Sequence, residues 1–481
     1  MNNRMTTYIL GRMLGVEAFV LLIPALVSWF YSEDGWKYFL ITSAILVAVY
    51  IAFGLRKPKD TKIYGRDGFV IIASAWVLWS LFGALPFWLS GSIPSYADAF
   101  FETISGFTTT GSTILTDASS LPMGMNFWRC FTHWIGGMGV LVFVMVIVSL
   151  EDKNSMHLMR AEVPGPETDK LVPKARDSAK ILYGMYLILT IAEVVFLLAG
   201  GMSLYDSLIH SFSTAGTGGF NNRANSVAYY DSAYIDGVIT VFMILFGINF
   251  NVYYFLLLKK VKAVFKNEEL RTYLAVILGA TVLITINILS VYDAPLKAFR
   301  YAVFQVSAII TTTGFVTADF NLWPEFSKCI LLLLMIIGAC AGSTGGGMKV
   351  SRIIILLKSV KREMKRLLHP QSVNLVKVNQ KKVSENTLQG VYMYFIAYIG
   401  VFIVSVLLVS LNNYDFTTTF SGVLTTLNNV GPGLAGVGPI ENFSHFSVLS
   451  KLVFCADMLI GRLEVFPFLM LLSPNLWRKK F

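Results

Sequence analysis

The stretch FQVSAIITTTGFVTADF, residues 304–320, starts as an amphipathic helix of about three turns and continues into threonines and a glycine. Three other stretches have the same form: AFFETISGFTTTGST (99–113), DSLIHSFSTAGTGGF (206–220) and FSGVLTTLNNVGPG (420–433). None of these helical runs reaches the roughly 20 residues that a helix needs to cross a bilayer. Because another apolar stretch follows each of them, we expect four short helices that enter the membrane and turn back within it.

The four stretches are in register when the ends of their helical runs are aligned. This alignment places Gly111, Gly218, Gly314 and Gly431 at one position. The glycines are roughly 100 residues apart, a period typical of an internal repeat of a whole structural unit. We therefore predict four copies of a unit made of a helix, a re-entrant half-helix, a loop and a second helix.

The sequence as a whole has the composition of a membrane protein. Of its 481 residues, 55% are hydrophobic and only 14% are charged, whereas soluble chains carry about 25% charged residues. We predict an all-α membrane protein with ten transmembrane helices. The predicted spans lie near residues 14–31, 37–55, 68–90, 127–150, 181–200, 235–258, 272–292, 327–358, 390–411 and 448–474.

Basic residues in the connections between spans account for the formal net charge of +10. With both termini in the cytoplasm, the basic runs all fall on one side, as the positive-inside rule requires, so we expect no nucleic-acid partner. These runs are 56–66, 153–180, 259–271, 358–382 and 478–480. The predicted units are an N-terminal two-helix extension (1–60) and four pore repeats (61–155, 156–265, 266–385 and 386–481), the third of which contains a gating loop.

Four re-entrant loops that meet at one axis would favour a cation there. Each half-helix would direct its negative carbonyl end toward the membrane midplane. Glycine takes a positive φ without penalty, so a loop that turns at glycine can point successive carbonyls inward to replace the hydration shell of an ion. The histidines and cysteines have no spacing typical of a metalloenzyme, and we expect no enzymatic activity.

At these residues the chain resembles the superfamily of Trk, Ktr and HKT potassium transporters, and within it the TrkH-type pore subunits of bacteria. The resemblance covers nearly the whole chain. It depends on FTTTGST (107–113), FSTAGTGGF (212–220), ITTTGF (310–315) and NNVGPG (428–433), with HWIGGMG (133–139), PGPETDKLVPKARDSAK (164–180) and STGGGMKVSR (343–352) in support. It implies a potassium uptake pore with pseudo-fourfold, potassium-channel-like repeats in the bacterial cytoplasmic (inner) membrane.

The resemblance also implies which residues form the selectivity filter and bind the transported K⁺, the only metal ion expected. They are Thr109, Thr110 and Gly111; Gly216, Thr217 and Gly218; Thr312, Thr313 and Gly314; and Asn429, Val430 and Gly431. The fourth loop departs from the threonine–glycine pattern. We therefore expect a less regular ion cage than in a symmetric potassium channel, and weaker discrimination of potassium from sodium.

A gate is expected below the filter, in the glycine-rich run GACAGSTGGGMK (338–349). Glycine at these positions disfavours a continuous helix, and irregular backbone at membrane depth must face protein or water. The resemblance implies that a loop here obstructs the pathway, with Gly342, Ser343, Thr344, Gly345, Gly346 and Gly347 as gate residues. The alternative is a glycine-rich packing face between helices.

Two charges lie inside apolar spans and must have a partner or a cavity. Arg462 is implied by the resemblance to be an electrostatic barrier below the filter, and the alternative is an ion pair with the nearby Asp457 or Glu464. Glu193 has no predicted role beyond that of a buried partner.

The resemblance further implies a homodimer in membrane lipid that binds a cytosolic, nucleotide-binding regulatory subunit of the TrkA type. The basic connection 358–382 is a candidate docking surface for that subunit, although it serves equally to fix the topology. Two other functions remain open. One is sodium- or proton-coupled potassium symport, and the other is a membrane receptor or enzyme that uses the external loops.

Overall fold

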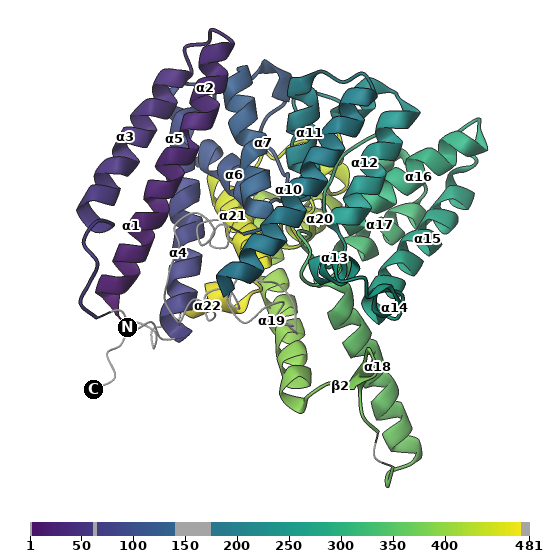
Figure 1. The fold of residues 1–481 in the computed structure, drawn as a ribbon. Helices are drawn as coiled ribbons and strands as arrows, with labels where there is room; N and C mark the ends of the chain where they lie inside the picture. The colour runs from purple at the N-terminus through teal and green to yellow at the C-terminus, as the bar shows by residue number, and fades with distance from the viewer. Residues whose placement is uncertain (1, 61–64, 140–174, 373, 473–481) are drawn as a thin grey trace.

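The computed structural model describes residues 2–60, 65–139, 175–372 and 374–472. Long helices stand side by side, and α18 with one end of α19 projects beyond the rest of the molecule (Figure 1). Three predicted segments lie largely or wholly outside the described residues: the basic run 153–180 with the block 164–180, the end of the span predicted for 127–150, and the basic run 478–480.

The structure is helical apart from one small hairpin. Residues 3–53 form α1 (Asn3–Val20), α2 (Leu22–Phe30) and α3 (Trp36–Phe53). Residues 65–137 form α4 (Gly65–Gly83), α5 (Leu85–Leu89), α6 (Tyr96–Phe107), η1 (Ala118–Ser120) and α7 (Met123–Gly137). Residues 175–265 form α10 (Ala175–Ala199), α11 (Leu204–Gly216), η2 (Ser226–Tyr230), α12 (Ala233–Phe246), α13 (Phe250–Leu257) and α14 (Val261–Phe265).

The C-terminal half has the same character. Residues 268–382 form α15 (Glu268–Ile288), α16 (Pro295–Ile310), η3 (Phe320–Leu322), α17 (Glu325–Ile337), α18 (Val350–Leu368), β1 (Lys377–Val378) and β2 (Lys381–Lys382). Residues 385–472 form α19 (Glu385–Val409), η4 (Ser410–Asn412), α20 (Phe416–Leu427), η5 (Ala435–Val437), α21 (Val448–Arg462) and α22 (Phe466–Leu472). The antiparallel pair β1–β2 is a local exception to the all-α prediction.

The predicted spans differ in how continuous they are. In the described part of the chain, six helices are long and apolar enough to cross a membrane, and the pair α12–α13 is a seventh candidate that is bent by 89°. The bend corrects the straight span predicted for 235–258, and it arises because the Asn249 side chain accepts a hydrogen bond from Asn251 N and starts a new helix. The span predicted for 448–474 is also broken, at Glu464 and Val465, both of which have positive φ.

Four short helices cover the segments that the sequence predicts as re-entrant, but each begins earlier than predicted: α6, α11 and α20 begin at Tyr96, Leu204 and Phe416, and α16 begins at Pro295, well before Phe304. Ser95, Ser203 and Asp415 cap α6, α11 and α20 by accepting hydrogen bonds from backbone N–H groups, while α16 starts at a proline. The hydroxyl and backbone N–H of Thr418 donate to Asp415 and lower the pKa of its carboxyl group. Each start is therefore encoded locally, by one cap or one proline.

Hydrogen bonds brace the N-terminal extension internally and join it to the body. The Ser43 hydroxyl donates to the Ala18 carbonyl at 2.8 Å, joining α3 to α1. The Glu33 carboxylate accepts hydrogen bonds from Met123 N at 2.6 Å and Gly124 N at 3.0 Å, and so caps the start of α7. A carboxylate at a helix N-terminus is favourable because it faces the positive end of the helix dipole.

Close packing of α1 on α3 generates a first prediction. A Cβ on Gly11 would lie 2.8 Å from the backbone nitrogen of Gly54, whereas Gly279 on α15 has nothing within 4 Å. We expect Gly11→Leu to lower the free energy of unfolding by about 1–3 kcal/mol through overpacking, and to lower the melting temperature in detergent. Gly279→Leu controls for the helix propensity of leucine, and equal melting of the two variants would contradict the assigned contact.

Candidate ion pathway

The loops that follow α6, α11, α16 and α20 meet one another inside the molecule. Each packs a glycine against a backbone carbonyl of the next loop, and a Cβ on that glycine would lie less than 3.0 Å from the oxygen. The four pairs are Gly111 with Gly218 O, Gly219 with Thr313 O, Gly314 with Val430 O, and Gly431 with Thr110 O. Because the fourth loop returns to the first, the contacts form a closed ring, which we call the glycine ring.

The predicted register is wrong by one residue in the second loop. Hydrogen bonds at the helix ends make Thr217 equivalent to Thr109, because each donates its backbone N–H to the carbonyl three residues earlier. The glycine with positive φ, equivalent to Gly111, is then Gly219 and not Gly218. The second loop contributes Thr217, Gly218 and Gly219, and Gly216 ends α11. The sequence could not show this shift, because Gly218 and Gly219 are adjacent and either glycine fits the alignment.

The four loops share an unusual backbone conformation. Residues with positive φ occur at alternate positions: Thr109, Thr217, Thr312 and Asn429 have φ of 55–59°, and the ring glycines follow two residues later with φ of 74–102°. A β-branched residue rarely adopts a left-handed conformation. Backbone strain of this kind persists only where surrounding structure enforces it, and it clusters at functional sites.

The fourth loop is joined to the ring by an asparagine amide, where the first and third loops use threonine hydroxyls. In the first and third loops the hydroxyl groups of alternate threonines are 2.8 Å apart. In the fourth loop, Asn429 Nδ2 donates to Thr110 Oγ1 and to Met458 O, each at 2.9 Å. The Ser112 hydroxyl donates to Gly431 O at 3.1 Å, so two side chains join the first and fourth loops.

A pocket opens onto one face of the glycine ring. Its lining includes all four ring glycines together with Arg129, Arg223 and Glu441. The two arginines are paired with carboxylates on the short helices, Arg129 with Glu102 and Arg223 with Asp206. This pairing offsets positive charge that would otherwise repel a cation from the pocket.

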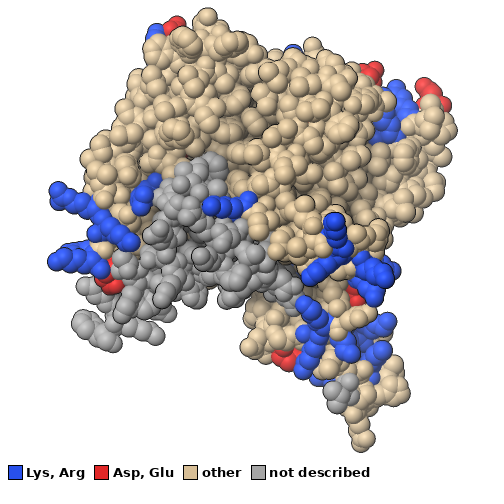
Figure 2. Space-filling model, viewed as in Figure 1, with Lys and Arg blue, Asp and Glu red and all other residues tan. Residues whose placement is uncertain are grey.

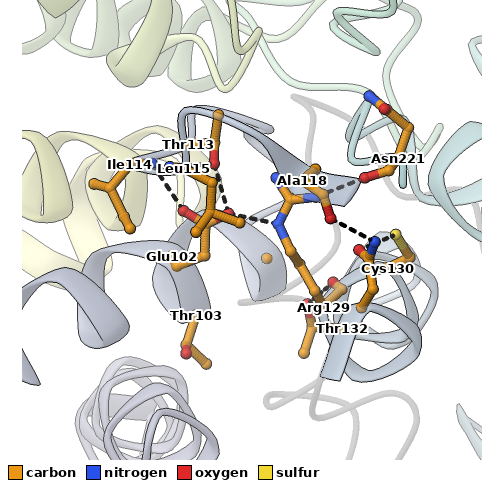
Figure 3. A network of polar contacts seen from close by, with 12 residues as sticks. Glu102, Thr103, Thr113, Ile114, Leu115, Ala118, Arg129, Cys130, Thr132 and Asn221 are labelled. Atoms are coloured by element: carbon orange, nitrogen blue, oxygen red, sulfur yellow. Dashed lines mark hydrogen bonds and ion pairs between the residues drawn. The ribbon is translucent and has the colours of Figure 1, made fainter. Parts of the chain in front are cut away.

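The Glu102–Arg129 pair supports the first two loops from behind (Figure 3). Glu102, on α6, accepts hydrogen bonds from Thr113 Oγ1 at 2.8 Å and Ile114 N at 3.0 Å, directly after the first loop. Arg129, on α7, lies 2.5 Å from Glu102, donates to Asn221 O at 2.9 Å after the second loop, and stacks on the Phe220 ring. Both side chains are at least 97% buried.

On the other face of the ring lie residues 338–349, the segment that the sequence predicts as a gate, which we call the gate loop. It separates α17 from α18, as its glycines predict. Gly346 N donates to Thr312 Oγ1 at 2.6 Å, and Gly347 N donates to Asn428 O at 3.0 Å. The loop therefore contacts the third loop of the ring and the start of the fourth. These hydrogen bonds satisfy buried backbone N–H groups of the loop. Irregular backbone is tolerated inside a membrane protein when its polar groups are paired in this way.

Arg462 joins the gate loop to the other side of the pathway. Its guanidinium donates to Thr344 O at 2.7 Å and, at the end of α7, to Gly137 O at 2.7 Å and to Gly136 O. The alternative partners are engaged elsewhere: Asp457 accepts a hydrogen bond from Ser405, and Glu464 pairs with Arg352. Arg462 thus lies beside the gate loop, in contact with backbone carbonyls.

The structure brings together most of the residues singled out by sequence. The residues predicted for the filter and the gate lie in contact with one another, apart from Gly216, whose place in the ring Gly219 takes. Glu193 is fully buried on α10 beside α11, and no ion pair is recorded for it within the described residues. Sequence reasoning missed Glu102 and Arg129, although charges inside the apolar runs AFFETIS and MNFWRCF could have indicated a buried pair.

His133 was also missed. Its Nδ1 is 2.7 Å from Gly106 O, and its ring occupies the space that a Cβ on Gly218 would need. Among the described residues, no group of three or more His, Cys, Asp or Glu side chains could hold a metal ion.

Comparison with known proteins agrees with this arrangement. The family model TrkH, described as a cation transport protein, matches residues 37–479. The chain belongs to the TrkH family. It is therefore a transport protein and not an enzyme. A TrkH-family relative, the Trk system potassium uptake protein TrkH of Salmonella typhimurium, is 38% identical over 485 residues, with both chains fully covered.

Two further TrkH-family proteins extend the comparison. The Trk system potassium uptake protein TrkG of Escherichia coli is 32% identical over 481 residues, covering 99% of each chain. The crystal structure of the potassium transporter TrkH from Vibrio parahaemolyticus superposes with a TM-score of 0.88 at 34% identity, covering 99% of this chain and all of that one.

The buried pair Glu102–Arg129 generates a second prediction. Arg129→Met would leave the Glu102 carboxylate buried and unpaired, and we expect a loss of about 3–5 kcal/mol in the free energy of unfolding. Lys37→Met, which removes an exposed cation paired with Asp34, is the matched control and should melt like the parent. Adding Glu102→Gln to Arg129→Met should restore part of the lost stability. If Arg129→Met has the same melting temperature as the parent, the pair has no structural role.

Proposed function

We propose that this protein takes up potassium across the bacterial cytoplasmic membrane through a pore whose selectivity filter is the glycine ring. The observation that carries the proposal is the closed ring itself, in which four backbone segments from distant parts of the chain surround one axis. Carbonyl oxygens that surround an axis can replace the hydration shell of an alkali ion. The uptake function named for the Salmonella and Escherichia relatives supports potassium as the ion.

Electrostatics favours a cation at this place. The helices α6, α11, α16 and α20 end at the four loops, so their negative carbonyl ends face the ring. Inward movement of a monovalent cation is then driven by about 2.3 kcal/mol per 100 mV of membrane potential. No further energy source is required for uptake.

The filter residues that we propose are Thr109, Thr110, Gly111, Thr217, Gly218, Gly219, Thr312, Thr313, Gly314, Asn429, Val430 and Gly431. In the fourth loop Asn429 stands at the position of the threonines. The cage is therefore less regular than one with four equal quadrants, and we expect it to discriminate potassium from sodium less strongly.

Gating is assigned to the gate loop together with Arg462. The loop lies directly under the third and fourth filter loops, and Arg462 connects it to the first quarter of the molecule. A fixed cation on the pathway opposes the passage of another cation. Displacement of the loop, with Arg462, would open the pathway.

The finer architecture is part of the same proposal: ten membrane-crossing segments, a two-helix extension at 1–60, and pore repeats at 61–155, 156–265, 266–385 and 386–481. On the face shown in Figure 2, basic side chains gather mostly toward the end of the molecule where α14 and α18 lie. By the positive-inside rule that end faces the cytoplasm, with both chain termini on that side.

The projecting helix α18 is the proposed contact for a cytosolic regulatory subunit. It carries Lys358, Lys361, Arg362, Lys365 and Arg366 together with the exposed apolar side chains Leu357, Val360, Met364, Leu367 and Leu368. An apolar stripe with basic neighbours suits a protein partner of acidic surface. We further propose a homodimer and a nucleotide-binding regulatory subunit of the TrkA type, on the strength of family membership.

A coupled sodium–potassium or proton–potassium symporter is the second candidate, because family membership alone does not fix the coupling. Potassium flux measured against varied sodium and proton gradients separates the two mechanisms. Flux that follows potassium and voltage alone supports the pore.

Substitution of a ring glycine generates a third prediction. A serine at Gly314 would place a Cβ against Val430 O at a φ of +74°, so the ring must open. In liposomes we expect Gly314→Ser and Gly219→Ser to reduce the preference for potassium over sodium about tenfold, or about 1.4 kcal/mol. Gly237→Ser, on α12 with nothing within 4 Å, should conduct as the parent does. Unchanged selectivity in Gly314→Ser would contradict the filter assignment.

Removal of Arg462 generates a fourth prediction. Arg462→Met deletes three hydrogen bonds to the gate loop and α7 together with the fixed charge. We expect rubidium influx without any partner subunit to rise at least tenfold, because hydrogen bonds from a charged group, worth about 1.5–3 kcal/mol, no longer hold the loop in place. Lys262→Met, an exposed cation on α14, is the control. Equal or lower influx in folded Arg462→Met would show that the arginine does not close the pathway.

A further inference from the structure

A buried carboxylate holds one end of the gate loop. Glu269, the second residue of α15, accepts a hydrogen bond from Ala341 N at 2.7 Å and is only 6% exposed. The backbone N–H of Ala341 belongs to no helix, so without Glu269 it would be a buried donor lacking a partner. The carboxylate in turn needs hydrogen bonds to be tolerated in a buried position.

The contact divides the gate loop into two parts. We call residues 338–342 the shoulder and residues 343–347 the tip. Backbone hydrogen bonds from Cys340 N to Gly247 O and from Phe250 N to Gly342 O, 3.1 and 3.0 Å long, fix the shoulder to the bend between α12 and α13. The tip lies between Gly342 and Gly347, which have φ of 66° and 73° and can serve as pivots.

Glu269 is distinct from the other polar contacts of the loop. Within the described part of the chain it supplies the one carboxylate recorded as a hydrogen-bond partner of residues 338–349. It also attracts Lys349, a buried lysine at the end of the loop whose ammonium donates to Gly345 O and is repelled by Arg462 and Arg352. The same side chain therefore supplies both an acceptor for the shoulder and a counter-charge for the loop.

A cavity lies beside this contact, on the side of the molecule where α14 and α18 lie. It is lined by Asn249, Glu269, Ala341 and Ser351, and by residues 378–381 of the hairpin. The preceding residue, Glu268, belongs to a different network: its N–H donates to Asn379 Oδ1 at 2.8 Å and its carboxylate pairs with Lys358. Glu269 thus contacts the gate loop, whereas the adjacent Glu268 contacts the surface hairpin.

We propose that Glu269 is a positioning residue of the gate, which fixes the shoulder through Ala341 N so that the tip stays beneath the filter loops. With the shoulder fixed, Gly346 N reaches Thr312 Oγ1 and Gly347 N reaches Asn428 O. Without the anchor, the tip leaves this position more often and the pathway opens without a partner. This inference rests on the proposed function of the loop as a gate.

A native cysteine reports the position of the shoulder. Cys340 adjoins Ala341 and is 1% exposed, so it reacts with thiol reagents only when the shoulder moves. In a parent with Cys130→Ala, Cys329→Ala and Cys455→Ala, Cys340 is the remaining thiol. The measurement is the rate of its modification by a charged methanethiosulfonate applied in inside-out vesicles, together with rubidium flux in liposomes.

Three variants separate the hydrogen bond from the charge. Glu269→Ala removes both, and we expect labelling of Cys340 about tenfold faster or more, as for loss of a charge-assisted hydrogen bond, with raised partner-independent flux. Glu269→Gln keeps an acceptor oxygen without the charge and should label within about threefold of the parent, since most of a neutral hydrogen bond is retained. Glu268→Ala is the matched control and should leave the rate unchanged.

Several outcomes would overturn the proposal. They are parent-like labelling of Glu269→Ala, equal acceleration by Glu268→Ala, and Glu269→Gln labelling as fast as Glu269→Ala, which would assign the effect to charge alone. If Glu269→Ala does not assemble, Glu269→Asp tests the proposal, because aspartate keeps the charge but its side chain is one methylene shorter. Faster labelling of Cys340 in Glu269→Asp supports the anchor. Labelling at the parent rate rejects it. Absence of potassium flux in the parent would reject the proposed function, whereas labelling still tests the anchor.

Discussion

The close approach of four backbones around one axis is the constraint on which the rest of the structure depends. At the ring, each glycine leaves no space for a Cβ because a carbonyl of the next loop occupies it. Only glycine permits both this approach and the positive φ. The short helices, the loops behind them and the gate are all arranged to hold these four peptide segments together.

Buried polar interactions supply that support. Unpaired backbone groups cost several kcal/mol in a bilayer, and here specific side chains satisfy them: Glu102 behind the first loop, Asn429 at Met458 O, and Arg462 and Glu269 at the gate loop. Such groups are costly to bury but fix one geometry, since an alternative arrangement would leave a charge or a peptide group unpaired. These contacts hold both the glycine ring and the irregular segment beside it in one arrangement.

The two faces of the ring differ in character. The pocket on one face contains arginines that are already paired with Glu102 and Asp206, so their charge is offset. On the other face, the hydrogen bonds recorded for Arg462 and Lys349 go to backbone carbonyls, and the cations lie among the loop segments. Positive charge thus lies among the loop segments on this face, with Glu269 as a counter-charge to Lys349.

The sequence by itself determined the membrane class, the four short helices and the interruption at 338–349, because hydropathy, period and glycine content are local properties. It also identified Arg462 as a charge that needed a special environment. Only the tertiary structure decided the register of the second loop, since Gly218 and Gly219 are equivalent in sequence and only contacts with Thr313 and His133 distinguish them. The pairing of Glu102 with Arg129, and of Glu269 with Ala341, likewise joins residues far apart in the chain, and no local pattern specifies such partners.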